Sequence, residues 1–227
     1  MRILHTSDLH GRFGYLIRAL ESLDYDIWID TGDLLPDRSY NSYADLYAKD
    51  FAEKNLMFQL RSLAEFAPRI LKALRGRHGI FVPGNHDFAS AASALSNLSP
   101  DENIHQLIDG SSRVELHGHV FAGFRHVTPI NGMWKGELPE SDIKAIAQAA
   151  FGQRPTVLCT HTPPYSILDW VRGSLFVGSK SLLSCFRNED HNILLSLFGH
   201  VHESNGSQEA DGTRFYNGAC GARIIEL

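Results

Sequence analysis

The stretch "SLFGHVHES" at residues 196–204 ends an apolar run and then presents two histidines, His200 and His202, separated by one residue. The same triplet, GHV, occurs earlier in "ELHGHVFAG", where His117 and His119 have the same spacing. In a β-strand this spacing points two side chains to one face, so either pair could bind a metal ion. The spacing alone does not distinguish the two pairs, so the other motifs of the chain have to be considered.

Four other short apolar runs precede the run that leads into His200, and each is typical of a buried strand. The five runs are "RILHTS" (2–7), "DIWID" (26–30), "GIFVP" (79–83), "TVLCT" (156–160) and "NILLSLF" (192–198). At the end of each run lie Asp, Asn or His residues, within the blocks "SDLH", "DTGDL", "PGNHD", "THTPP" and "GHVH". Taken singly, each block is ordinary turn chemistry. Together they indicate a site, because ligands of α/β proteins gather at strand ends.

The apolar pattern also predicts the fold class. Helical spacing is found near 15–22, over about 42–75 and near 140–150, and an Ala/Ser-rich helix follows the third strand. We expect Pro68 to kink or divide the long helical segment. Alternation typical of β-structure runs through 103–124 and returns at the end of the chain. The chain is therefore predicted to be a single α/β domain, residues 1–227, in which two sheets pack together with helices outside.

Composition excludes several classes of function. The 227 residues carry a net charge of −5, and Lys and Arg are scattered, so we expect no stable binding of duplex nucleic acid. No apolar run is long enough for a membrane span, and the N-terminus lacks the pattern of a signal peptide. The three cysteines form no metal or disulfide pattern. We therefore expect a cytoplasmic protein that has no membrane partner; its oligomeric state is left open.

The ordered blocks D-x-H, GD, GNHD, H and GHxH resemble the signature of the calcineurin-like metallophosphoesterase superfamily, and they extend over residues 8–202. The resemblance implies a four-layer α/β/β/α sandwich and two metal ions. One ion would be held by Asp8, His10, Asp33 and His202, and the other by Asp33, Asn85, His161 and His200. In this pattern His86 is not a ligand but contacts or protonates the substrate, with Asp87 as the partner that orients its ring.

The donor chemistry agrees with this implication. Imidazole, carboxylate and amide donors without thiolate suit divalent manganese, iron or zinc. Two such ions about 3.5–4 Å apart lower the pKa of a bridging water, and the resulting hydroxide attacks a phosphate ester. His86 could then act as the general acid. The reaction class implied is hydrolysis of a small phosphoester substrate without a covalent enzyme intermediate.

Motifs in the second half of the chain limit the range of expected substrates. "THTPPYSILDWVRG", "LFGHVHESNG" and "FYNGACG" resemble the small phosphoesterases that include the mammalian brain metallophosphoesterase-domain proteins. That resemblance implies phosphodiesterase activity on small diesters such as cyclic nucleotides. Three alternatives remain: a phosphomonoesterase or protein phosphatase, a DNA nuclease, and a noncatalytic protein-binding member of the superfamily. The nuclease is considered because "RILHTSDLHG" resembles the start of repair nucleases of the superfamily.

A few residues near these blocks are weaker candidates. Arg12 could reach a phosphate, and Tyr165 could form a wall of the substrate pocket, whereas Trp170 is expected to pack structurally. Three tyrosines after Asp33 could stack on a base or simply pack in a helix: Tyr40, Tyr43 and Tyr47. Gly118 between the first pair of histidines indicates a hairpin turn, so that pair need not share a face.

Overall fold

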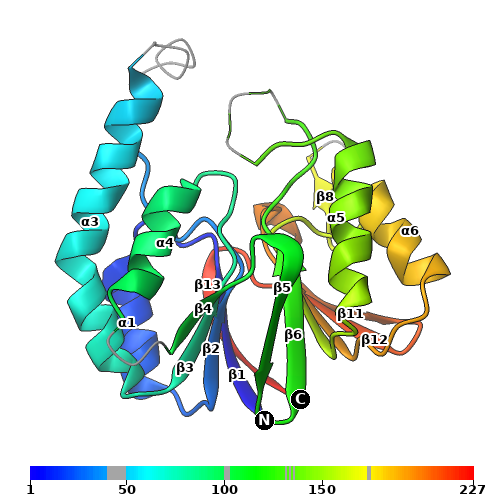
Figure 1. The fold of residues 1–227 in the computed structure, drawn as a ribbon, viewed down its shortest axis with the longest axis horizontal. Helices are drawn as coiled ribbons and strands as arrows, with labels where there is room; N and C mark the ends of the chain where they lie inside the picture. Colours follow the sequence, from blue (N-terminus) through cyan, green and yellow to red (C-terminus); the bar gives the residue numbers. More distant parts are fainter. Residues whose placement is uncertain (40–49, 100–102, 131, 133, 135, 173–174) are drawn as a thin grey trace.

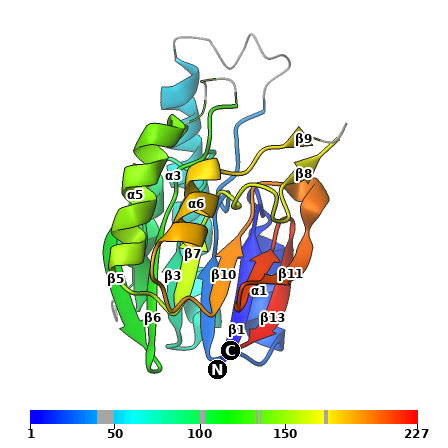
Figure 2. The same ribbon diagram turned by 90° about the vertical axis from the view of Figure 1, so that its right-hand side faces the viewer.

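The computed structural model describes residues 1–39, 50–99, 103–130, 132, 134, 136–172 and 175–227. Two sheets pack face to face, and helices cover the outer side of each, so that the molecule has four layers (Figures 1 and 2). The predicted α/β sandwich flanked by helices is confirmed. Tyr40, Tyr43 and Tyr47 lie outside the described residues.

The first sheet has the strand order β13-β1-β2-β3-β4, in which β1 to β4 are parallel and β13 is antiparallel to β1. Three helices cover its outer face, on the left of Figure 1. The strands are β1 (Arg2–Ser7), β2 (Ile27–Asp30), β3 (His78–Phe81), β4 (Ile104–Gln106) and β13 (Gly221–Glu226). The helices are α1 (Phe13–Ser22), α3 (Phe51–Leu74) and α4 (Ala89–Asn97).

The second sheet has the order β11-β12-β10-β7-β6-β5, and its four inner strands are parallel. Its strands are β5 (Asp109–Leu116), β6 (His119–Phe124), β7 (Val157–Thr160), β10 (Leu195–Phe198), β11 (Gly206–Ala210) and β12 (Thr213–Asn217). Helices α5 (Glu140–Gly152) and α6 (Lys180–Asn188) pack on its outer face. A short hairpin, β8 (Trp170–Val171) with β9 (Leu175–Phe176), and a 3-10 turn, η1 (His202–Ser204), complete the described part.

Residues of the central strands are buried on both faces, which explains why the strands read as continuous apolar runs. In β2, Ile27 and Ile29 pack between the two sheets, while Trp28 packs under the helices of the first sheet. Parallel strands covered on both sides need this composition. They also place their carboxyl ends, and the loops that follow, at one edge of each sheet.

Two details of the helices differ from the prediction. Helix α3 is one continuous element that includes Pro68, so the proline does not divide it. The buried side chains of Leu63, Ala67 and Ile70 hold this part of α3 against the core, which offsets the backbone hydrogen bond that Pro68 cannot donate. Helix α6 was not predicted; its Ser179 N-cap accepts a hydrogen bond from the Leu182 amide. Among the described residues, no helix has the length and apolar composition that a bilayer crossing requires.

Candidate metal centre

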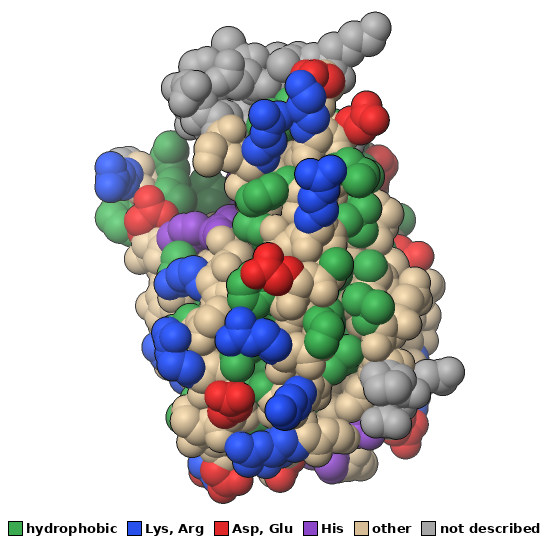
Figure 3. Space-filling model, turned by 90° about the vertical axis from the view of Figure 1, so that its left-hand side faces the viewer, with side chains coloured by type: hydrophobic (Ala, Val, Ile, Leu, Met, Phe, Trp, Pro, Cys, Tyr) green, Lys and Arg blue, Asp and Glu red, His purple; other side chains and the backbone are tan. Residues whose placement is uncertain are grey.

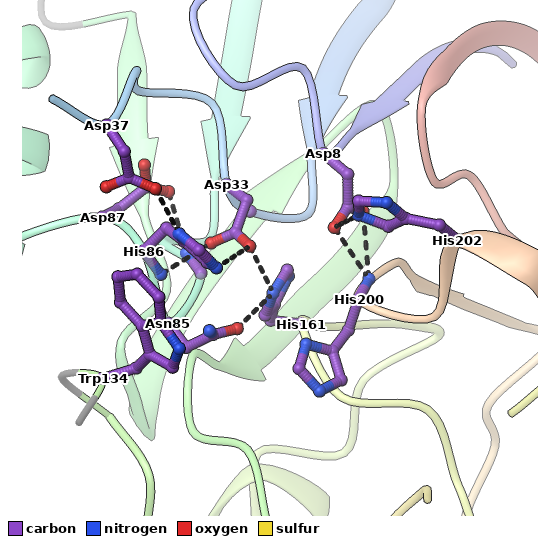
Figure 4. Close-up of polar contacts among 12 residues, drawn as sticks. Asp8, Asp33, Asp37, Asn85, His86, Asp87, Trp134, His161, His200 and His202 are labelled. Atoms are coloured by element: carbon purple, nitrogen blue, oxygen red, sulfur yellow. Dashed lines mark hydrogen bonds and ion pairs between the residues drawn. The ribbon is translucent and has the colours of Figure 1, made fainter. Parts of the chain in front are cut away.

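The seven predicted metal ligands lie on the loops after β1, β2, β3, β7 and β10, at one end of the sandwich. Figure 4 shows those other than His10. Five of the seven, Asp8, His10, Asp33, His161 and His202, fall in overlapping groups, within each of which the donor atoms lie no more than 4.8 Å apart. One group contains Asp8, His10 and His202. A second contains Asp8, Asp33 and His161. Carboxylates shared between groups are what a centre with two neighbouring ions requires.

Several side chains of the cluster lie in direct contact. His202 Nε2 lies 3.1 Å from Asp8 Oδ1. His161 Nε2 lies 3.3 Å from Asp33 Oδ2 and 3.0 Å from Asn85 Oδ1. The ring of His200 packs edge-on against His161, with centroids 5.0 Å apart. The ring of His202 therefore lies beside Asp8 and the ring of His200 beside His161, while Asp8, Asp33 and His161 also form one group.

Three glycines that immediately precede ligands are required by the crowding of the centre. A Cβ atom on Gly84 would lie 2.0 Å from Asp33 Oδ1, and one on Gly199 would lie 2.2 Å from Asp8 Oδ2. A Cβ atom on Gly32 would lie 2.4 Å from His161 Nδ1. The blocks GD, GN and GH thus contain glycine because the backbone of one ligand loop passes directly against the side chain of another.

The ring of His161 is oriented for ligation by its second nitrogen. Nδ1 lies 2.7 Å from the carbonyl oxygen of Thr31 and donates to it, which turns Nε2 toward Asp33. Burial disfavours the charged ring, but the carboxylate of Asp33 outweighs it and raises the pKa of His161 to about 9. The carboxylates therefore stabilise a positive charge at this position. The same carboxylates would stabilise the positive charge of a divalent ion.

The partner of His86 is Asp37, not Asp87. Nδ1 of His86 makes a close ion pair with Asp37 Oδ2, whereas Nε2 is turned toward Asp33 Oδ2 at 4.0 Å (Figure 4). Burial alone would lower the pKa of His86, but the charges of Asp33 and Asp37 and the Asp37 hydrogen bond raise it to about 9. The ring of His86 is thus held by Asp37 at the edge of the ligand cluster, where it also forms a group with His10 and Asp33.

The prediction that Asp87 orients the His86 ring is therefore wrong. Its carboxylate points away and accepts hydrogen bonds from the backbone amides of Leu34, Leu35 and Gly84 at 2.8–3.3 Å. Asp87 thereby joins the loop after β2 to the loop after β3. The buried guanidinium of Arg125 fixes the second loop from behind by donating to the carbonyl oxygens of Gly84 and Asp87.

A cavity of about 650 Å³ opens onto the centre. In the face of the molecule shown in Figure 3, histidine side chains are visible beside a hollow. The lining residues are His10, Asp33, Asn85, His86, Thr128, Pro129, Ile130, Trp134, Val171, Val177, His200, Val201, His202 and Glu203. Apart from the predicted metal ligands, most of the side chains in this lining are apolar.

Trp134 is a site residue that the sequence reasoning missed. Its ring lies on His86, with centroids 3.8 Å apart, and its backbone amide donates to the carboxylate of Glu137. The same carboxylate accepts the amides of Ile130 and Gly132 and so shapes this loop. An isolated Trp in a segment without periodicity gave no signal of this role.

Among the described residues, three weaker candidates are absent from the lining of the cavity: Arg12, Tyr165 and Trp170. Arg12 folds back and donates to the carbonyl oxygens of Asp8 and Leu9, so it supports the first ligand loop. The ring of Tyr165 packs near Phe176 and Lys180. Trp170, expected to be packed, is 44% exposed, because it lies in the β8–β9 hairpin at the surface.

The comparisons with known proteins agree with the fold and the centre. Residues 1–204 match the Calcineurin-like phosphoesterase family model. The chain belongs to the Calcineurin-like phosphoesterase family.

Metallophosphoesterase domain-containing protein 1 of Homo sapiens is 26% identical over 192 residues, 75% of this chain and 57% of the human protein, and its Mus musculus counterpart gives the same values. The chain thus spans little more than half the length of these curated relatives. The protein TT1561 of Thermus thermophilus superposes with a TM-score of 0.64 at 17% identity, over 96% of this chain and 88% of that one. A dimetal phosphatase from Danio rerio gives 0.54 at 12% identity, over 96% and 86%. At these identities, the two superpositions show a shared fold.

Proposed function

We propose that the chain is a phosphodiesterase with two divalent metal ions that hydrolyses small phosphodiesters, cyclic nucleotides among them. The observation that carries the proposal is the position of Asp33, which belongs both to the ligand group of His161 and to the group of His10, with the ring of His86 beside it. Asp8, His10, Asp33 and His202 would hold one ion. Asp33, Asn85, His161 and His200 would hold the other.

The ions, when bound, supply the positive charge that activates a water molecule and neutralises the phosphate oxygens. The chain then contributes the groups that complete the reaction. As the oxygen of water bonds to phosphorus, the bond from phosphorus to the ester oxygen breaks, and His86 donates its proton to the departing oxygen. Asp37 holds the ring of His86 through Nδ1, which leaves Nε2 facing the cavity. The ligands, as N and O donors, suit manganese, iron or zinc.

The charge of the cavity supports a diester over a monoester. Two divalent ions bring four positive charges, of which Asp8 and Asp33 neutralise two. Among the described residues that line the cavity there is no Lys or Arg, and Glu203 at its wall adds a negative charge. The described lining thus offers no further cationic side chain of Lys or Arg for the second charge of a monoester, which favours a phosphodiester with one negative charge. The apolar side chains of Pro129 and Ile130 in the lining offer a surface for the uncharged part of a diester.

The test is metal-dependent turnover by the chelator-treated protein after addition of manganese, iron or zinc. We expect hydrolysis of bis(4-nitrophenyl) phosphate, and of members of a cyclic nucleotide panel, to exceed that of 4-nitrophenyl phosphate. Asp33→Asn should remove the activity, while Asp142→Asn, which changes an exposed carboxylate on α5, should keep it. Turnover that needs neither metal nor Asp33 would overturn the enzyme proposal. A wide preference for the monoester would overturn only the diester part and favour a phosphatase.

A further inference from the structure

The buried face of α3 changes its chemistry where the helix reaches the site. Its inner half buries apolar side chains, such as Leu63, Ala67 and Ile70. One and two turns nearer its N-terminus, the same face buries two amides, Gln59 and Asn55, which are 0% and 1% exposed. Burying amides in a helix face costs free energy unless every polar atom finds a partner. The partners of these two amides surround His86.

Asn55 holds the partner of the His86 ring. Its Nδ2 donates to Asp37 Oδ1 at 2.8 Å, and its Oδ1 accepts the backbone amide of Arg38 at 2.7 Å. The other oxygen of Asp37 pairs with His86 Nδ1. Asn55, Asp37 and His86 therefore form one continuous chain of contacts from α3 to the cavity.

Gln59 holds the backbone of the same loop. Its Nε2 donates to the carbonyl oxygen of His86 at 2.8 Å, and its Oε1 accepts the amide of Phe88 at 3.0 Å. Both ends of the amide are used, so its orientation is fixed by its partners. His86 is thus restrained at its ring through Asn55 and at its main chain through Gln59.

We infer that Asn55 and Gln59 are positioning residues for the general acid His86, and that α3 serves as its support. An amide is the side chain that can donate to a carboxylate or carbonyl oxygen while accepting from a backbone amide. Leucine at residue 55 would leave Asp37 Oδ1 without this donor. Aspartate there would place a second negative charge beside Asp37. The inference rests on the proposed function, and it gives the described part of the segment between β2 and β3 a role in the reaction.

The consequence is a selective dependence on the leaving group. General acid catalysis contributes roughly 10²–10⁴-fold, and an acid displaced by more than about 0.5 Å loses part of that contribution. A poor leaving group such as phenolate needs the proton more than 4-nitrophenolate does. Loss of positioning therefore slows the phenyl ester more than the 4-nitrophenyl ester.

The experiment compares kcat/KM for phenyl methyl phosphate and 4-nitrophenyl methyl phosphate in the metal-loaded wild type and in Asn55→Leu and Gln59→Leu. We expect a loss of about tenfold or more with the phenyl ester and less than about threefold with the 4-nitrophenyl ester. Leu63→Ala is the matched control on the same face of α3: it removes packing without touching the loop of His86, so its ratio of the two rates should equal that of the wild type.

A second comparison separates positioning from general damage. In a His86→Ala background the effect of Asn55→Leu on the ratio should disappear, because the group that it positions is gone. If Asn55→Leu does not fold, Asn55→Ser, which is too short to span Asp37 and the Arg38 amide, replaces it. Equal losses with both esters, or a change of ratio that persists without His86, would overturn the inference. Absence of metal-dependent turnover of either ester by the wild type would instead overturn the proposed function.

Discussion

Gly84→Ala tests whether the crowding of the ligand loops sets metal affinity. The φ angle of Gly84 is not positive, so alanine meets no backbone penalty there and the effect is steric. The new methyl carbon would lie 2.0 Å from Asp33 Oδ1 and 2.5 Å from the Asp33 backbone nitrogen. Rotation of the Asp33 side chain relieves only the first contact. The two loops must therefore move apart.

The size of the effect follows from these contacts. An opening from 2.0 Å to an ordinary contact requires a shift of more than about 1 Å, roughly twice the tolerance of a working site. Overpacking of this kind costs about 1–3 kcal/mol of folding free energy. We expect metal affinity to fall about 10–100-fold, which reduces the stabilisation by bound metal by about 1.4–2.8 kcal/mol. For a chain of this size, this loss of stabilisation by metal corresponds to a decrease of about 3–10 °C in the melting temperature.

The assay is thermal unfolding with chelator and with excess manganese or zinc, together with the metal content of the purified protein. The rise in melting temperature that metal produces in the wild type should shrink in Gly84→Ala. Gly152→Ala, at the end of α5 with no atom within 4 Å of the new Cβ, is the matched control and should keep the full rise. A full metal-dependent rise in Gly84→Ala would refute the reasoning that Asp33 requires this glycine.

Two further predictions concern histidines of different kinds. Burial lowers the pKa of His5 to about 3, so the folded protein keeps this ring neutral while the unfolded chain protonates it below its ordinary value of 6.5. This contribution is present in full above the unfolded value and is lost as the pH falls toward 3, by up to about 1.4 kcal/mol per pH unit. In urea unfolding of chelator-treated protein, the wild type should lose about 2 kcal/mol more than His5→Gln between about pH 7 and pH 5, and an equal loss would contradict the assignment. The second prediction separates the two GHV triplets: His117→Asn creates the Asn-Gly pair that suits the β5–β6 turn, where φ is 51° at His117 and 76° at Gly118, and should leave turnover unchanged. His200→Asn should lower metal-dependent turnover by at least about tenfold, and similar activity in the two variants would contradict the choice of the second triplet.

The sequence predicted well which side chains meet at one end of the sandwich, because their placement depends on local rules. Strands buried on both faces read as apolar runs, and the carboxyl ends of parallel strands meet at one edge. Asp8, Asp33, Asn85, His161 and His200 each follow such a run by a few residues. A glycine or a turn at each strand end was visible too, although the reason for glycine at residues 84 and 199 became clear only from contacts between loops.

The support of His86 could not be predicted in the same way because it depends on distant contacts. Asp87 is next to His86 in sequence, but consecutive residues at a tight turn point in different directions, and Asp87 serves the backbone of the neighbouring loop instead. Asp37 is 49 residues away, and its contact exists only because the loops after β2 and β3 converge. Trp134 approaches from a loop of the second sheet, for which the periodicity of the chain carries no information.

The strain at the centre shows how these distant contacts and the local ligands act together. Asp8, His10, Asp33 and His200 have φ angles between 44° and 69°, a region that non-glycine residues enter at a cost of about 1–3 kcal/mol each. Hydrogen bonds between loops hold them there: the amides of Asp8 and His10 donate to the carbonyl oxygens of Gly32 and Asp33, and the amide of His200 donates to the Asp8 carboxylate. Each strained ligand is therefore fixed by the loop of another ligand. The cost of assembling the centre is met on folding, so that metal binding has only to displace protons and not to order the loops.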